Sequence, residues 1–151
     1  MAKVPSKQSP LNSALAKIPN LSQQLNKLVD EASATVRQVE SFLEKAHVGS
    51  VNSKIDLEST SDFTTSLRYE RIGAKFRIAV ATENHGVPPP EAAFSVRAFS
   101  DCPRDLKLQA FQKLPELIEQ IVANLESMID KTKETTKEVM ESIGLPPKVD
   151  E

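Results

Sequence analysis

A single cysteine, Cys102, is the residue whose type is best suited to covalent chemistry. It lies at the expected start of a helix beside Arg104 and Lys107, and both cations and a helix N-terminus lower the pKa of a thiol. No histidine lies near it in the sequence to act as a general base. A lone cysteine also excludes an internal disulfide and a cysteine-rich metal site. We therefore predict a structural cysteine rather than a nucleophile.

The two histidines are the next candidates for chemistry. His85 follows Glu83 and Asn84, residue types that bind metals, but the same group before a glycine is typical of a polar turn. His47 lies at the expected end of a helix, where it can interact with the helix dipole. The two are far apart and show no HxxxH or HxxE spacing. We predict no metal, no cofactor and no catalytic residue, and hence a protein that is not an enzyme.

A basic face of a predicted sheet is the last candidate site. It is expected to carry Arg68, Lys75, Arg77 and Arg97. Small side chains between them would allow an anion, an acidic peptide or single-stranded RNA to lie flat. RNA-binding sheets usually display two or more aromatic side chains for stacking, and only Phe99 is expected there. We favour a solvated face balanced by acids, or a packing surface for a second subunit, and keep anion or nucleic-acid binding as the alternative function.

Length, composition and charge narrow the class of protein. The chain has 151 residues, enough for one domain, and its net charge of −2 argues against nucleic-acid binding by bulk charge. No apolar run reaches membrane-spanning length, and the first residues lack the apolar block of a signal peptide. These features predict a cytoplasmic protein that does not insert into a membrane.

Two long amphipathic helices are expected to cover the predicted sheet and so to position its residues. One begins after Pro19, with Asn20 as its N-cap, and continues to about Ala46. The other occupies the last third of the chain, entered through a short helical turn from Asp101 and kinked or restarted at Pro115. Their apolar residues recur at three- and four-residue steps, close to coiled-coil spacing. Their similar lengths predict that they lie side by side.

Between the helices the apolar period falls to two, which indicates strands. A weak strand is expected at residues 51–57 and a clear hairpin at 67–80, whose turn at Gly73 pairs Tyr69 with Ile78 and Glu70 with Arg77. The face predicted to lie under the helices carries Leu67, Tyr69, Phe76, Ile78, Val80, Phe94 and Val96. The predicted class is α+β, with two long helices packing on a small three- or four-stranded antiparallel sheet in helix–strands–helix order.

The helices are longer than the strands, which predicts association. We expect a loosely ordered arm over residues 1–19, a single domain over 20–145 and a flexible tail over 146–151. Helix ends that overhang the sheet by roughly 15 Å would leave apolar side chains wet. The candidate interface residues are Leu21, Leu25, Leu28, Met128, Ile129, Val139 and Met140. We predict a homo-oligomeric interaction or scaffold protein, most simply a dimer, unless the arm folds back to cover the same flank.

Overall fold

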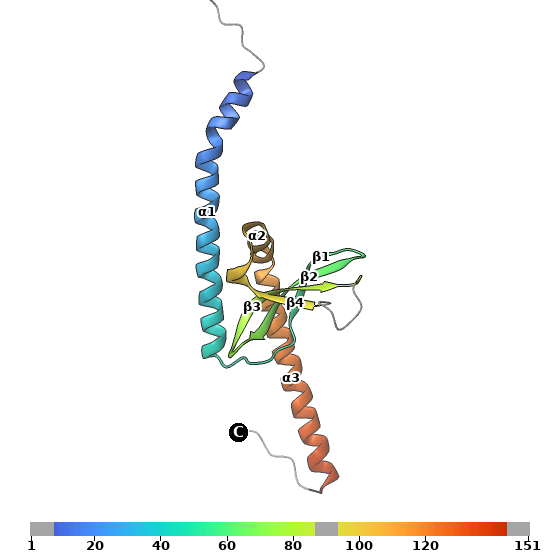
Figure 1. Ribbon diagram of the computed structural model, residues 1–151. Helices are drawn as coiled ribbons and strands as arrows, with labels where there is room; N and C mark the ends of the chain where they lie inside the picture. The colour runs from blue at the N-terminus through green and yellow to red at the C-terminus, as the bar shows by residue number, and fades with distance from the viewer. Residues whose placement is uncertain (1–7, 87–93, 145–151) are drawn as a thin grey trace, which may run out of the picture.

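The computed structural model describes residues 8–86 and 94–144. Its elements are α1 (Gln8–Lys45), β1 (Lys54–Ser59), β2 (Phe63–Ile72), β3 (Lys75–Asn84), β4 (Phe94–Ala98), the 3₁₀ turn η1 (Phe99–Asp101), α2 (Arg104–Gln112) and α3 (Leu114–Ser142). The predicted α+β class in helix–strands–helix order is confirmed (Figure 1). The predicted restart of the last helix is also confirmed, because α3 begins one residue before Pro115.

The four strands form one antiparallel sheet in chain order. The central hairpin has the predicted register, with Ile72 opposite Lys75 and Tyr69 opposite Ile78. Gly73 has a φ of 65°, a conformation that costs glycine little and other residues more. The first strand begins at Lys54 rather than at residue 51, and a bulge interrupts it between Asp56 and Glu58.

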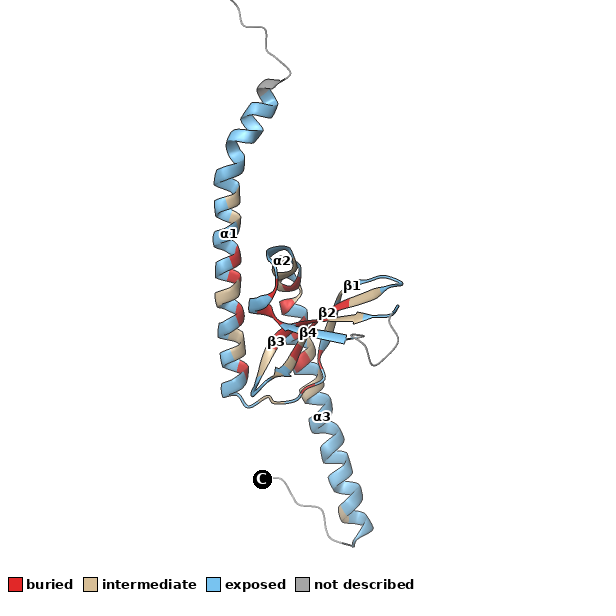
Figure 2. Ribbon diagram, in the orientation of Figure 1, coloured by how far each residue is buried: buried red, intermediate tan, exposed pale blue. Residues whose placement is uncertain are grey.

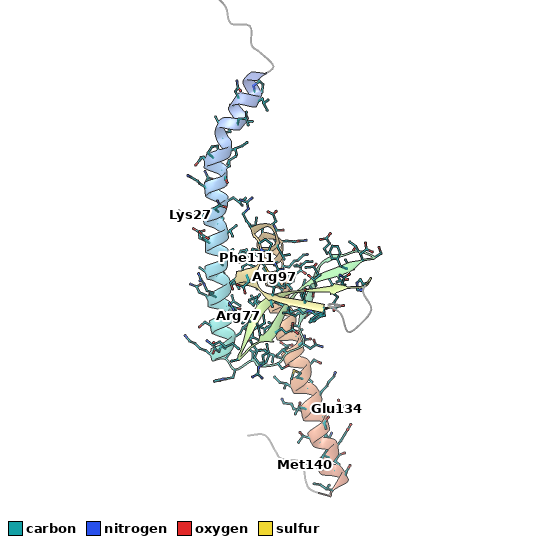
Figure 3. All side chains as sticks on the ribbon, in the orientation of Figure 1. Lys27, Arg77, Arg97, Phe111, Glu134 and Met140 are labelled. Atoms are coloured by element: carbon teal, nitrogen blue, oxygen red, sulfur yellow. The ribbon has the colours of Figure 1, made fainter. Side chains whose placement is uncertain are left out.

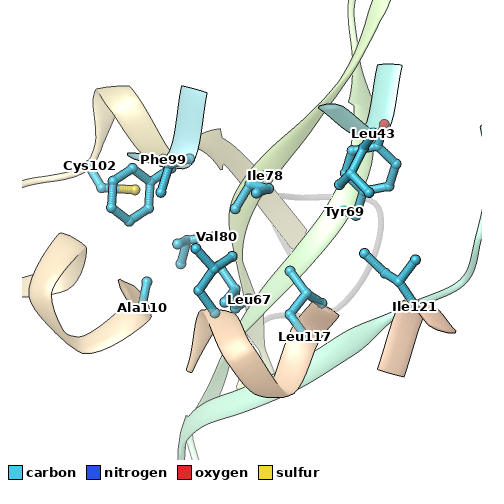
Figure 4. Close-up of a cluster of buried hydrophobic side chains, with 12 residues drawn as sticks. Leu43, Leu67, Tyr69, Ile78, Val80, Phe99, Cys102, Ala110, Leu117 and Ile121 are labelled. Atoms are coloured by element: carbon cyan, nitrogen blue, oxygen red, sulfur yellow. The ribbon is translucent and has the colours of Figure 1, made fainter. Parts of the chain in front are cut away.

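The helices bury one face of this sheet. Leu67 of β2 and Leu117 of α3 are fully buried, and α1 adds Val36 and Leu43 to the same cluster (Figure 4). Burying one aliphatic side chain of this size contributes about 1.5–3 kcal/mol, so this aliphatic cluster is the main source of stability. On α3, Ile121 is also buried in this cluster, whereas Ile118 is 36% exposed.

The orientation of β4 differs from the prediction. Phe94 and Val96 were expected under the helices, but Val96 pairs with Ala81 and therefore lies on the opposite face. Phe94 is 45% exposed, whereas Phe99, expected outside, is buried in the core. Phe99 enters the core from η1, directly after the strand, and this orientation places Arg97 opposite Val80.

The start of α1 is the second difference. The helix runs from Gln8 through Pro19 to Lys45, so the predicted start at Asn20 is wrong. A proline inside a helix removes one backbone hydrogen bond and usually bends the helix, and α1 bends in its blue N-terminal third (Figure 1). Part of the arm predicted to be loose is therefore helical. The predicted tail over 146–151 lies outside the described residues.

The third difference is the direction of the long helices. They were predicted to lie side by side, with their overhanging ends together. Instead both run from the top of the view to the bottom and pack against the same face of the sheet, α1 projecting above the sheet and α3 below it (Figure 1). The short helix α2, which packs on α1, lies between β4 and α3 in the chain and is joined to α3 through the single residue Lys113. The candidate interface residues of the two helices thus lie at opposite ends of the molecule.

Candidate interaction surfaces

Cys102 lies in the core and not at a reactive surface. Only 6% of the residue is exposed, and its Sγ donates a hydrogen bond to the Ala98 carbonyl oxygen at 3.4 Å. Burial raises the pKa of the thiol, and this outweighs the positive charges of Arg97 and Lys107, which act to lower it. The thiol therefore stays protonated and poorly nucleophilic at neutral pH.

The histidines do not come together with metal ligands. His85 lies at the end of the hairpin, where its Nε2 is 2.9 Å from the Thr64 hydroxyl, and its backbone N–H donates to Asp62. His47 follows the end of α1 and has a positive φ of 54°. Among residues 8–86 and 94–144, no three His, Cys, Asp or Glu residues are grouped so as to hold a metal ion.

The four basic residues do not form one open surface. Arg68 lies across its sheet face, with Nη2 2.7 Å from Glu83 Oε1, Nε 2.9 Å from Ser66 Oγ and its guanidinium 5.1 Å from the Phe94 ring centroid. Its side chain is only 16% exposed, so it covers the small residues of the face. Arg97 lies opposite Val80, on the other face of the sheet.

Arg77 serves to attach α1 to the sheet. Its Nε is 3.5 Å from Glu40 of α1, and the same carboxylate accepts a hydrogen bond from the Ile78 N–H at 2.7 Å. This N–H is free because β4 pairs with β3 only from Ala79 onward. Glu70, which lies opposite Arg77 in the register, keeps one buried carboxylate oxygen without a hydrogen-bond partner among the described residues.

The remaining candidates are the two projecting helix ends, which we call the α1 arm (residues 8–25) and the α3 arm (residues 126–143). Residues 10–25 of the α1 arm and the whole α3 arm are almost entirely exposed (Figure 2). In Figure 3, Lys27 lies on the part of α1 above the sheet and Met140 lies near the lower end of α3. Of the candidate interface residues, Leu25 and Met140 are half-buried and the other five are exposed.

The rest of the described molecule (the sheet, η1, α2 and the parts of α1 and α3 outside the arms) is called the body. The α1 arm continues the apolar stripe of α1 that packs on this body. Alternating steps of four and three residues join Leu11, Leu15, Ile18, Ser22, Leu25, Val29, Ala32, Val36, Val39 and Leu43. The stripe is buried or half-buried from Val29 onward, whereas Leu11 and Leu15 are 59% and 54% exposed. The body ends at this point because α2 reaches α1 no further than Asn26, whose side chain accepts a hydrogen bond from Arg104 at 3.2 Å.

The α3 arm behaves in the same way at the other end. Leu125 is the last residue of α3 that packs against the core, and Asn124 anchors the helix by donating to the Asn52 carbonyl and the Ser53 hydroxyl at 3.0 Å. Beyond this point Ile129 is 53% exposed and Val139 is 51% exposed. In α1 the same alternation of four- and three-residue steps also joins Leu28 and Phe42, which face solvent, so the spacing alone does not identify the buried stripe.

Comparison with known proteins adds no constraint. No protein-family model, curated protein or solved structure matches the chain. Within the part of the chain that the structure describes, no helix combines the length and apolar character needed to cross a membrane.

Proposed function

We propose that this protein is a non-enzymatic interaction or scaffold protein that self-associates through its long helices. One observation carries the proposal: both helices extend beyond the body with the same apolar periodicity that buries them within it, and no described residue covers these extensions. Exposed apolar surface of this kind usually marks an association site, because its burial by a partner is favourable.

The polar candidates support a non-catalytic role. The only cysteine is buried with a raised pKa, and His85 is held at a hairpin end by Thr64. Two of the four basic residues are held in ion pairs with acids of the body, Arg68 with Glu83 and Arg77 with Glu40. The geometry therefore favours association over catalysis or anion binding.

Sedimentation equilibrium of the full chain between about 1 and 100 μM tests this proposal. We expect a mass above that of one chain, and expect Leu15→Asp combined with Ile129→Asp to return it to a monomer. Ser13→Asp combined with Ser127→Asp places the same charges on the opposite faces of the same arms and should leave the mass unchanged. A wild-type chain that stays monomeric throughout would contradict self-association.

A further inference from the structure

The α3 arm carries a regular heptad pattern. Alternating steps of four and three residues join Ile118, Val122, Leu125, Ile129, Thr132, Thr136, Val139 and Ile143. This period of 3.5 keeps one face toward a partner helix when the two helices supercoil, and is the pattern of a coiled-coil seam. At the level of the body the seam lies beside the sheet-facing side of α3, since Leu117 and Ile121 are buried while Val122 is 49% exposed.

The hydroxyl groups of the two threonines in the seam form hydrogen bonds within α3. The Thr132 hydroxyl donates to the Met128 carbonyl at 2.7 Å, and the Thr136 hydroxyl donates to the Thr132 carbonyl at 2.8 Å. Both hydroxyls therefore already have an acceptor within the helix, and a covering helix would leave neither donor unpaired. The whole length of the seam can therefore be covered by a partner helix, although two of its residues are polar.

A shallow hollow lies on this seam. It is lined by Lys131, Thr132, Thr135, Thr136, Val139 and Met140. Four of these, at 132, 135, 136 and 139, have the spacing i, i+3, i+4, i+7, which is the set of four residues that receives one side chain of a facing helix in coiled-coil packing. The small threonines leave room there for a large side chain.

We propose that the α3 helix of a second copy of this chain covers the α3 arm, and that the two helices pair antiparallel about a twofold axis. This deepens the proposed self-association and rests on it. In the register that uses the whole seam, the exposed side of half-buried Leu125 of one copy lies over the hollow at Thr136 of the other, and Ile129 lies against Thr132. Each of these layers joins a large and a small side chain, as close packing requires.

Charge favours this register. The positions that flank the seam on one side hold Glu126 and Lys133, and antiparallel pairing places Glu126 of each copy beside Lys133 of the other. Parallel pairing would set Thr132 and Thr136 against their own copies, which leaves both layers under-filled. The α3 arm points away from the body, so antiparallel pairing also places the two bodies at opposite ends of the helix pair (Figure 1).

A matched set of charged variants in the full chain tests the surface. We expect Ile129→Asp, on the seam, to raise the dimer dissociation constant by at least about 100-fold in sedimentation equilibrium. Ser127→Asp, on the opposite face of the same turn, should change it by less than about threefold. Loss of dimer in Leu15→Asp but not in Ile129→Asp would overturn the inference and leave the proposed function standing. A monomeric wild-type chain would overturn both.

Disulfide cross-linking tests the orientation of the two paired helices. The cysteine variants are made in a Cys102→Ala chain whose oligomeric mass and helix content are first shown to equal those of the wild-type chain. Val122 of one copy is expected to face Val139 of the other. A mixture of the Val122→Cys and Val139→Cys chains should therefore oxidise to mixed disulfide dimers, whereas Val139→Cys alone should form few. Efficient self-cross-linking of Val139→Cys would show parallel helices and overturn the antiparallel arrangement.

Discussion

The body and the arms of this protein contain the same kind of helix in two different environments. Within α1 one apolar stripe passes from buried Val36 and Leu43 to exposed Leu11 and Leu15. Within α3 the seam that holds exposed Ile129 lies beside the buried side of the helix that holds Leu117. The hydrophobic period is unchanged where the sheet stops. Periodicity therefore identifies which face of a helix is apolar, whereas only the rest of the fold shows what covers that face. In the arms, no described residue covers it.

The two arms also differ from each other. In addition to its seam, the α1 arm exposes Leu21, and Leu28 follows seven residues later, so the apolar surface is broad and is interrupted by Pro19. The α3 arm also exposes Met128 beside its seam, but no proline interrupts this seam, and Glu126 and Lys133 lie on one flank of it. An uninterrupted seam with charged flanking positions suits a pair of helices. This is why we place the homodimer seam on α3.

The largest expected contrast is between two aliphatic residues of α3. Leu117→Ala should lower the free energy of unfolding by about 2–5 kcal/mol, because it removes a fully buried side chain from the core. Ile129→Ala should cost less than about 0.5 kcal/mol at a protein concentration low enough to keep the chain monomeric. Urea denaturation followed by circular dichroism measures both. Equal losses would mean that the arm is covered within one chain.

The attachment of α1 to the sheet should show a smaller effect. Glu40→Ala removes the acceptor of the Ile78 N–H and the partner of Arg77, and should cost about 1–3 kcal/mol. Glu70→Ala is the matched control on the neighbouring strand, where one buried carboxylate oxygen has no described partner, and should cost less than about 1 kcal/mol. An equal loss of unfolding free energy in both variants would show that the Glu40 contacts do not hold α1 on the sheet.

Alkaline pH should lower the free energy of unfolding of the body. Burial is the main cause that raises the pKa of Cys102, and burial followed by the charges of Glu40 and Glu44 raises that of Tyr69. An acid whose pKa is higher in the folded state contributes stability below its unfolded pKa and loses it as the pH rises. Unfolding free energy should therefore decline above about pH 9, and Cys102→Ala should reduce this decline. Stability that rises between pH 9 and 10 would contradict the assignment.

The smallest global effect is expected from the α1 arm. Pro19→Ala restores one backbone donor in α1 and favours local helix by about 3 kcal/mol. Hydrogen exchange of the amides around residue 19 should slow, while the global unfolding midpoint stays within error because the arm lies outside the cooperative core. A shift of that midpoint by several degrees would show that the arm packs on the body or on a partner under the same conditions.

The sequence alone determined the features that depend on near neighbours. The turn at Gly73 and two alternating strands define the hairpin register, because a slip of one residue would turn every apolar side chain outward. Likewise, Pro115 and the apolar steps after it predict the restart of the last helix. For the candidate sites, the sequence predicted a structural cysteine at Cys102, and the structure buries this residue in the core.

The tertiary structure decided the features that depend on which side chains, distant from one another in the sequence, are buried together in the core. The apolar alternation of β4 is Phe94, Val96 and Ala98, but with Phe99 of η1 buried in the core this alternation lies on the outer face, and Arg97 is separated from the other basic residues. The two helix overhangs lie at opposite ends of the molecule, which the periodicity of the helices did not indicate (Figure 1). Pro19 remained helical although proline disfavours helix interiors. For β4 and for the long helices the local pattern permits more than one arrangement, and packing between elements that are distant in the sequence chooses among them.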